Sequence, residues 1–119
     1  MKKTLVLGAS LNPSRYSNLA IHRLIAAGHP VVAVGIREGE VAGIEITSEK
    51  KEFDNLHTIT LYLSAKHQPE FYEYILSLRP KRVIFNPGTE NDSLYQLLQQ
   101  NDIEAEIACT LVLLSTNQY

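Results

Sequence analysis

The segment from residue 8 to residue 17 gathers small, hydroxyl-bearing and basic side chains directly after a short apolar run. It reads Gly-Ala-Ser-Leu-Asn-Pro-Ser-Arg-Tyr-Ser, and a stretch with helical spacing follows it. Free backbone N–H groups, hydroxyls and the positive end of a helix together bind phosphate. The residues that would contribute to such a cradle are Gly8, Ser10, Ser14, Arg15 and Ser17. The alternative is a capped turn whose course Asn12-Pro13 shapes.

This segment matches neither common phosphate-binding fingerprint. It has the first glycine of a GxGxxG pattern but not the other two, and it lacks the Lys-Ser/Thr pair of a Walker motif. The prediction of a phosphate cradle therefore depends on where the segment lies in the fold.

A second apolar segment ends in Val34-Gly35-Ile36-Arg37. A unit that binds NAD carries Asp or Glu at this point to accept hydrogen bonds from the ribose, whereas a basic residue suits a phosphorylated ribose. Arg37 therefore indicates NADP or coenzyme A, and Ile36 would offer an apolar shelf to an adenine. Because Glu38 and Glu40 follow at once, the alternative is that Arg37 is a solvated charge.

A third polar segment, Asn86-Pro87-Gly88-Thr89-Glu90-Asn91-Asp92, follows the apolar run that ends at Phe85. Pro-Gly predicts a tight turn, and Gly88 would let a ligand approach the backbone. The amide and acidic side chains suit hydroxyl and amide groups, such as those of a pantetheine arm, rather than phosphate. The alternative is ordinary turn and helix-cap chemistry.

Candidates for catalysis are few. Of the four histidines, only His67 is expected on the same side of the fold as the three polar segments, and the sequence assigns it no Ser or Cys partner. Cys109 ends an apolar run, where a buried, inert thiol is expected. No spacing resembles a zinc or calcium motif, so no metal is expected.

Short apolar runs alternate with stretches of helical period along the chain, which predicts an α/β unit. The expected strands are Thr4 to Leu7, Pro30 to Gly35, Thr58 to Leu63, Arg82 to Phe85 and Ile103 to Ala108. The expected helices run from a Ser17 cap to a Gly28 stop, from Pro69 to Arg79-Pro80, and onward from Asp92 or Ser93. Residues 36–55 are expected to be connecting structure, and residues 110–115 stay open between helix and strand.

Five strands joined by right-handed crossovers predict a doubly wound parallel sheet between two helical layers, in one domain spanning residues 1–119. Ligands of such sheets bind beyond the carboxyl ends of the strands, next to the first strand, where the strand order reverses. The three polar segments follow the first, second and fourth expected strands. All three should therefore border one site.

Charge and apolar patterning narrow the partners. Eleven basic and thirteen acidic side chains give a formal charge of −2, and without a basic field neither nucleic acid nor an anionic membrane is an expected partner. The first apolar run stops after three residues at Gly8, and no stretch approaches the roughly 18 apolar residues that span a bilayer. A single cysteine fits a reducing compartment, so the expected location is the cytoplasm.

At these segments the chain resembles the small stand-alone CoA-binding proteins, whose domain is similar to the nucleotide-binding part of the succinyl-CoA synthetase α-subunit. Their first pattern, with Gly-x-Ser, Asn-Pro or Asp-Pro, an Arg and an aromatic, is matched by Gly8, Ser10, Asn12-Pro13, Arg15 and Tyr16. Their second landmark is Val-Asn-Pro-Lys; here the basic position is kept at Arg37 and the Asn-Pro is lost. Their Gly-x-x-Asn loop and late cysteine are similar to Gly88-Thr89-Glu90-Asn91 and Cys109.

The resemblance implies a Rossmann-like fold with strand order 3-2-1-4-5 and coenzyme A across strands 1, 2 and 4. The main hypothesis is a module that binds coenzyme A or an acyl-CoA without catalysis, as a sensor or accessory subunit. The alternatives are a small NADP-dependent or acyl-transfer enzyme using His67 or Cys109, and a protein acting only through protein contacts. Oligomeric state and protein partners stay open. The expected ligand-binding residues are Gly8, Ser10, Asn12, Pro13, Arg15, Tyr16, Ser17, Arg37, Asn86, Pro87 and Gly88.

Overall fold

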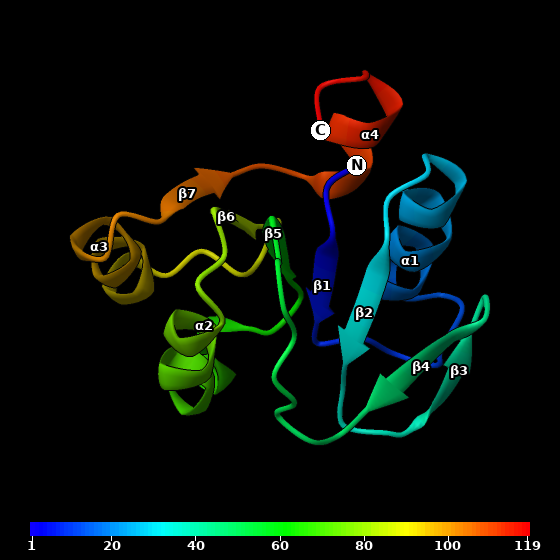
Figure 1. Ribbon diagram of the computed structural model, residues 1–119, viewed down its shortest axis with the longest axis horizontal. Helices are drawn as coiled ribbons and strands as arrows, with labels where there is room; N and C mark the ends of the chain where they lie inside the picture. The colour runs from blue at the N-terminus through cyan, green and yellow to red at the C-terminus, as the bar shows by residue number, and fades with distance from the viewer.

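The computed structural model describes residues 1–119 and contains a seven-stranded sheet with helices on both faces (Figure 1). The strands are β1 (Thr4–Leu7), β2 (Val31–Val34), β3 (Gly39–Val41), β4 (Ile44–Thr47), β5 (Thr58–Leu61), β6 (Arg82–Phe85) and β7 (Glu104–Ile107). The helices are α1 (Tyr16–Ala26), α2 (Tyr72–Leu78), α3 (Asp92–Gln100) and α4 (Thr110–Ser115), with short 3-10 helices η1 (Ala65–His67) and η2 (Pro69–Phe71). None of the helices has the length and apolar character that crossing a membrane requires.

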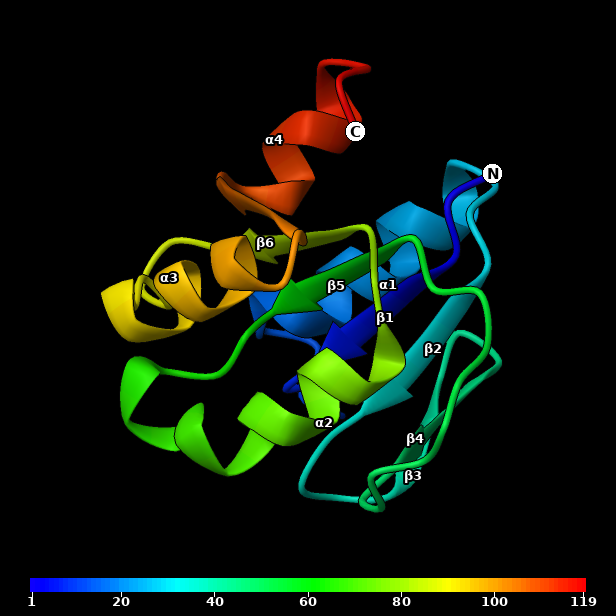
Figure 2. The same cartoon turned by 60° about the vertical axis from the view of Figure 1, so that its left-hand side comes forward.

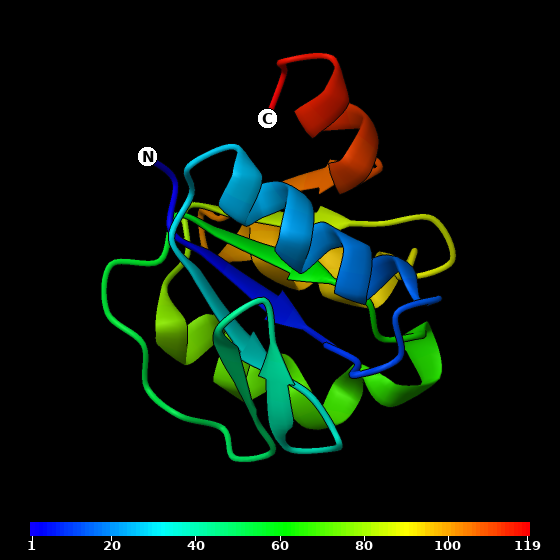
Figure 3. The ribbon, with the colours of Figure 1, turned by 90° about the vertical axis from the view of Figure 1, so that its right-hand side faces the viewer.

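The sheet separates two apolar cores. Helices α2 and α3 cover one face, where Leu5 and Leu7 of β1 are buried; α1 and α4 cover the other, where Val6 is buried. Figure 2 has α2 and α3 in front of the sheet, and Figure 3 has α1 in front. Because β1 is covered on both faces, Leu5, Val6 and Leu7 are all apolar rather than alternating with polar residues.

The five expected strands and the α/β class are confirmed. Segments β1, β2, β5, β6 and β7 each fall within one of the expected runs, and their pairings with one another are all parallel. The fold is a Rossmann-like sheet between two helical layers. Residues 110–115, whose type the sequence left open, form helix α4.

The interpretation of residues 36–55 as connecting structure is wrong, because they contain the antiparallel hairpin of β3 and β4. The two residues of its turn, Ala42 and Gly43, have φ values of 51° and 81°. Positive φ at both turn positions is typical of a type I′ hairpin, which normally uses Asn, Asp or Gly. Because alanine stands at the first turn position, the sequence gives no signal of this turn. With β3 and β4 included, the sheet has seven strands rather than the expected five.

The hairpin also corrects the strand order. The full order is β3-β4-β2-β1-β5-β6-β7. The order 3-2-1-4-5 expects the third strand, Thr58 to Leu63, beside the second, but in the structure this strand pairs with β1 through the register Thr4↔Thr58. Strand β4 takes the position beside β2 instead. With β4 counted as the third parallel strand, the six parallel strands have the order 3-2-1-4-5-6, and β1 remains the point where the strand order reverses.

The start of α1 also differs from expectation. Its N-cap is Arg15, with extended backbone and no side-chain cap, and Ser17 lies inside the first turn. The expectation that Ser17 caps this helix is therefore wrong. Helix α3 begins at Asp92 as expected, and Asn91 caps it by accepting hydrogen bonds from the backbone N–H groups of Ser93 at 3.1 Å and Leu94 at 3.4 Å.

Candidate functional site

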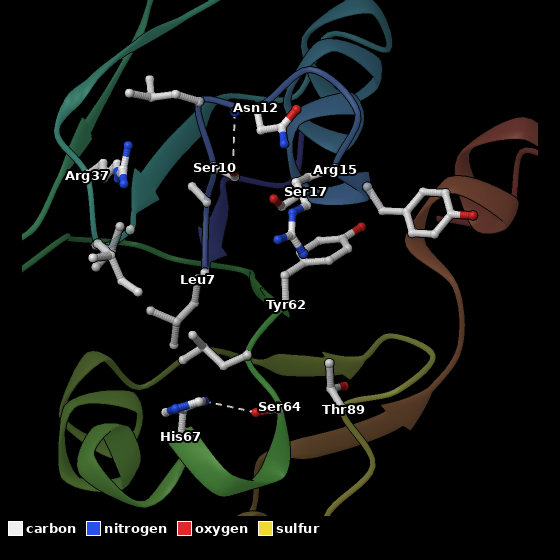
Figure 4. A pocket seen from close by; sticks show the side chains of 18 of the residues that line it. Leu7, Ser10, Asn12, Arg15, Ser17, Arg37, Tyr62, Ser64, His67 and Thr89 are labelled. Atoms are coloured by element: carbon white, nitrogen blue, oxygen red, sulfur yellow. Dashed lines mark hydrogen bonds between the residues drawn. The ribbon is translucent and has the colours of Figure 1, made fainter.

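A cleft with a volume of about 1330 Å³ opens at the carboxyl edge of the sheet, where the loops after β1, β2, β5 and β6 meet. Every ligand-binding residue expected from the sequence lines this cleft except Asn86. Figure 4 shows the first loop with Ser10 and Asn12 in the middle, Arg37 on one side and Arg15 and Ser17 on the other. The three polar segments thus border one cavity, as the topology of the sheet requires.

The first loop fixes its own shape through short-range hydrogen bonds. The backbone N–H of Asn12 donates to Ser10 Oγ at 3.1 Å, and Asn12 Oδ1 accepts from the N–H of Ser14 at 3.0 Å and from its hydroxyl at 2.8 Å. From α1, Asn18 Nδ2 donates to the Ser10 carbonyl at 3.0 Å. The Asn12 side chain therefore shapes the turn, which is the role that the alternative interpretation gave to Asn12-Pro13.

The same loop leaves a set of donors free. The backbone N–H groups of Ser10, Leu11, Tyr16 and Ser17 have no acceptor within the protein. Residue Ser17 is only 3% exposed and borders the cleft, and its hydroxyl has no hydrogen-bond partner within the protein. Arg15 is exposed at the cleft and takes part in neither of the protein's two ion pairs. The cavity is thus bordered by unpaired donors, a cation and a helix N-terminus, a combination with the chemistry of an anion-binding cradle.

Two glycines allow the loops around the cradle to approach one another. Gly8 has a φ of 96°, and a side-chain Cβ there would lie 2.8 Å from the carbonyl carbon of Tyr62. At Gly35 a Cβ would lie 2.2 Å from the carbonyl oxygen of Ala9. Any larger residue would push the β1 loop away from the β2 and β5 loops, so these glycines set the width of the site.

Arg37 reaches the cleft without a carboxylate partner. Its neighbour Glu38 is engaged elsewhere, because Glu38 Oε2 accepts a hydrogen bond from the Ser48 hydroxyl at 3.0 Å. Ile36 is 90% exposed and also lines the cleft. The β2 loop therefore presents an unpaired guanidinium beside an apolar side chain.

The β6 loop contributes Pro87, Gly88 and Thr89, while Asn86 has a structural role. Asn86 is 2% exposed, and its Nδ2 donates to Thr60 Oγ1 at 2.7 Å and to the Leu61 carbonyl at 2.9 Å. Its Oδ1 accepts from the N–H of Thr110 at 2.8 Å. This side chain ties β5, β6 and α4 together behind the cleft and does not line it.

The far wall of the cleft comes from the segment after β5, which sequence reasoning largely missed. It contributes Tyr62, Leu63, Ser64, His67, Glu70 and Phe71. The expectation that His67 lies on the same side as the polar segments is confirmed, and its Nδ1 is 2.9 Å from Ser64 Oγ. The two residues are brought together by the η1 turn, and a Ser-x-x-His spacing carries no signal for such a turn in the sequence.

A buried glutamine fixes this far wall. Gln68 is fully buried, and its Nε2 donates to the carbonyls of Leu63 at 2.9 Å and Thr89 at 2.7 Å. Its Oε1 accepts from Asn91 Nδ2 at 2.8 Å, and the same nitrogen contacts the Tyr72 hydroxyl at 2.8 Å. One side chain therefore joins the β5 loop, the β6 loop and the cap of α3.

The remaining titratable groups are poorly placed for chemistry in the cleft. Burial raises the pKa of Tyr62 to about 12, so its hydroxyl, which is buried without a partner, stays protonated. Cys109 is half-buried at the start of α4 and does not line the cleft. No group of three or more His, Cys, Asp or Glu side chains is arranged to hold a metal ion.

The sequence pattern of a family described as the CoA binding domain matches residues 2–115. The chain belongs to the CoA-binding domain family. Comparison with curated proteins finds no match.

Solved structures share this fold. The crystal structure of a protein described only as uncharacterized is 50% identical, with a TM-score of 0.98 over 100% of this chain and 98% of that one. A Thermus thermophilus protein is 20% identical, with a TM-score of 0.86 over 99% of this chain and 90% of that one. The dinucleotide-forming acetyl-coenzyme A synthetase 1 of Candidatus Korarchaeum cryptofilum is 14% identical, with a TM-score of 0.73 over 87% of this chain and 25% of that one. The two distant likenesses concern the fold alone.

Proposed function

We propose that this member of the CoA-binding domain family binds coenzyme A or an acyl-CoA in the cleft, as a non-catalytic module. The observation that carries the proposal is the cradle, in which unpaired N–H groups, the unpartnered Ser17 hydroxyl and Arg15 border one cavity. Donors that the protein leaves unpaired at a helix N-terminus favour an anionic ligand that accepts hydrogen bonds from them. A pyrophosphate is such a ligand.

The rest of the cleft supports coenzyme A over a simpler phosphate ligand. Arg37 would meet the phosphate on the ribose, and Ile36 would lie against the adenine. The pantetheine arm would extend in the other direction, past the β5 and β6 loops, where Gly88 borders open space and any Cβ there would touch nothing within 4 Å. The cleft therefore has cations at one end, while the other end has uncharged backbone and the carboxylate of Glu70, which does not suit a phosphate.

The role we propose is that of a cytoplasmic sensor or accessory subunit. Family membership supports a ligand class and specifies no reaction. The acetyl-coenzyme A synthetase that shares the fold is a much longer chain, of which this protein matches 25%. A chain that corresponds to one part of a larger protein is suited to hold the nucleotide while another component responds to it or acts on it.

Isothermal titration calorimetry tests the proposal with coenzyme A, acetyl-CoA and NADPH. We expect saturable binding of the coenzyme A ligands, weakening as salt rises, and little binding of NADPH. Arg15→Glu should weaken coenzyme A by more than about tenfold at low salt, because an attractive charge becomes repulsive. Arg23→Glu, the same charge reversal on α1 outside the cleft, is the matched control. Absence of coenzyme A binding at millimolar concentration refutes the proposal. Tighter binding of NADPH than of coenzyme A would also refute it and would indicate a redox cofactor as the ligand.

A further inference from the structure

The pairing of Ser64 with His67 has no role in the phosphate cradle. The two side chains lie on the far wall of the cleft, joined at 2.9 Å between Ser64 Oγ and His67 Nδ1. Both are exposed, and Figure 4 shows them on the opposite side of Leu7 from Ser10 and Arg15. A ligand anchored at the cradle would have to pass Leu7 to reach them.

The pair keeps one free donor whichever ring nitrogen carries the proton. If the Ser64 hydroxyl donates to Nδ1, the N–H at Nε2 is free. If Nδ1 carries the proton and donates to Ser64 Oγ, the hydroxyl hydrogen is free instead. The far wall therefore always offers one hydrogen-bond donor for an acceptor on the ligand.

The two ends of the cleft define the direction of the ligand. The unpaired cations Arg15 and Arg37 lie beside the β1 and β2 loops, while the β5 and β6 loops that form the other end carry neither Lys nor Arg toward the cavity. The phosphates of coenzyme A would stay with the cations, so its sulfur end would extend toward Ser64 and His67. At this end, free coenzyme A has a thiol, a weak acceptor, whereas an acyl-CoA has a carbonyl oxygen.

We propose that the Ser64–His67 pair donates a hydrogen bond to the thioester carbonyl, so that the cleft prefers acyl-CoA over free coenzyme A. This inference rests on the proposed function of the cleft. The donor is held in position because His67 precedes Gln68, whose buried amide fixes the turn to the β5 and β6 loops. Such a preorganised donor loses little freedom when the ligand binds.

The test compares two ligands of nearly equal size. Acetyl-CoA has the carbonyl oxygen, and S-ethyl-coenzyme A is the thioether that lacks it. The parent protein should bind acetyl-CoA about three- to tenfold more tightly, the contribution of one neutral hydrogen bond. The double variant Ser64→Ala/His67→Ala removes every donor of the pair and should bind both ligands equally, with its affinity for free coenzyme A within about twofold of the parent. The double variant His22→Ala/Ser115→Ala, at exposed positions outside the cleft, should keep the preference.

Three outcomes would overturn the inference. The first is that the parent binds acetyl-CoA and S-ethyl-coenzyme A equally, or that Ser64→Ala/His67→Ala keeps the preference for acetyl-CoA. Either result would show that the pair does not recognise the carbonyl, while the proposal that the cleft binds coenzyme A would be unaffected. Release of free thiol from acetyl-CoA by the parent but not by the variant makes the pair catalytic rather than a recognition element. Failure of all three coenzyme A ligands to bind the parent refutes the proposed function together with the inference.

Discussion

At the scale of single residues, the cleft is defined by charges that have no protein partner. Arg15 and Arg37 both line it and neither forms an ion pair. A guanidinium that keeps its donors free binds phosphate more strongly than one already engaged by a carboxylate, because no competing pair has to be broken. The two arginines should therefore make separable contributions to binding.

Arg37→Ala tests the contact with the ribose phosphate. We expect it to weaken coenzyme A by about tenfold or more and dephospho-coenzyme A by less than about twofold, since a charge-assisted hydrogen bond contributes roughly 1.5 to 3 kcal/mol. Calorimetric titration of both ligands measures the difference. Equal weakening of the two would show that Arg37 contacts another part of the ligand.

Ser17→Ala separates ligand binding from helix stability. Because Arg15 rather than Ser17 is the N-cap of α1, the substitution removes no cap hydrogen bond, and alanine is a better helix former. We expect an unchanged or slightly higher free energy of unfolding and weaker coenzyme A binding. Urea unfolding and titration of the same preparation measure both quantities. A loss of about 1 kcal/mol in stability, typical of a removed cap, would contradict the assigned N-terminus of this helix.

The sequence predicts residues at the cleft better than it predicts their individual roles. The rule that ligands bind beyond the first strand placed Gly8, Arg15, Arg37 and Gly88 at one edge, and the structure has them there. The same rule could not distinguish Asn86 from the residues that line the cleft. Asn86 precedes Pro87 in the chain, but its side chain is bonded to residues behind the cleft. Which way a loop side chain turns depends on partners such as Thr60 and Thr110, which are distant in sequence.

At the scale of elements, the sequence failed to predict the β3–β4 hairpin and the far wall of the cleft. Strands reveal themselves by apolar composition, but the β3–β4 hairpin has polar positions and an alanine in its turn. The far wall after β5 is built by two 3-10 turns, which have little composition signal of their own. No pattern in the sequence predicts the role of Gln68, although its buried amide joins three elements.

Gln68→Ala tests how strongly this glutamine organises the far wall. The change leaves the Leu63 and Thr89 carbonyls and one Asn91 N–H without their partner in a buried region. We expect the free energy of unfolding to fall by about 2 to 4 kcal/mol. Gln96→Ala, at an exposed position of α3, is the control and should change stability little. Equal stability of the two variants in urea unfolding would show that the Gln68 network is dispensable.

At the scale of the whole molecule, the edge of the sheet opposite the cleft is closed by the C-terminal segment. The Tyr119 ring lies 4.9 Å from the His29 ring and 4.5 Å from the Arg82 guanidinium, and its hydroxyl is 2.6 Å from Thr4 Oγ1. His29 Nδ1 accepts a hydrogen bond from the Lys2 N–H at 3.1 Å, which requires an unprotonated nitrogen. This edge therefore favours neutral histidine.

Acid should weaken the fold through this edge. Burial, followed by the positive charge of Lys2, lowers the pKa of His29 below its ordinary 6.5; burial, followed by Arg82, lowers the pKa of His57. At pH values between the folded and the unfolded pKa, the unfolded chain binds more protons than the folded chain does. The histidines' contribution to stability is therefore complete above about pH 6.5 and is lost as the pH falls from there through the folded pKa. The loss is at most about 1.4 kcal/mol per histidine for each pH unit.

Urea unfolding at about pH 7.5 and about pH 5.5 measures this loss. The double variant His29→Gln/His57→Gln should lose less stability between the two conditions than the parent does. His22→Gln, at an exposed position, is the control and should behave like the parent. An acid-induced loss that is the same in all three proteins would place its origin outside this edge.

The central claim is that the cleft at the carboxyl edge holds coenzyme A, and amide NMR spectra recorded during a coenzyme A titration test it most directly. We predict saturable shifts confined to the cradle from Gly8 to Ser17, the Ile36–Arg37 segment, the Ser64–His67 turn and Gly88. Amides at the opposite edge, around His29 and Tyr119, should not move. Shifts that cluster at that opposite edge or along β7 and α4, or spectra that do not change at saturating ligand, would contradict the claim.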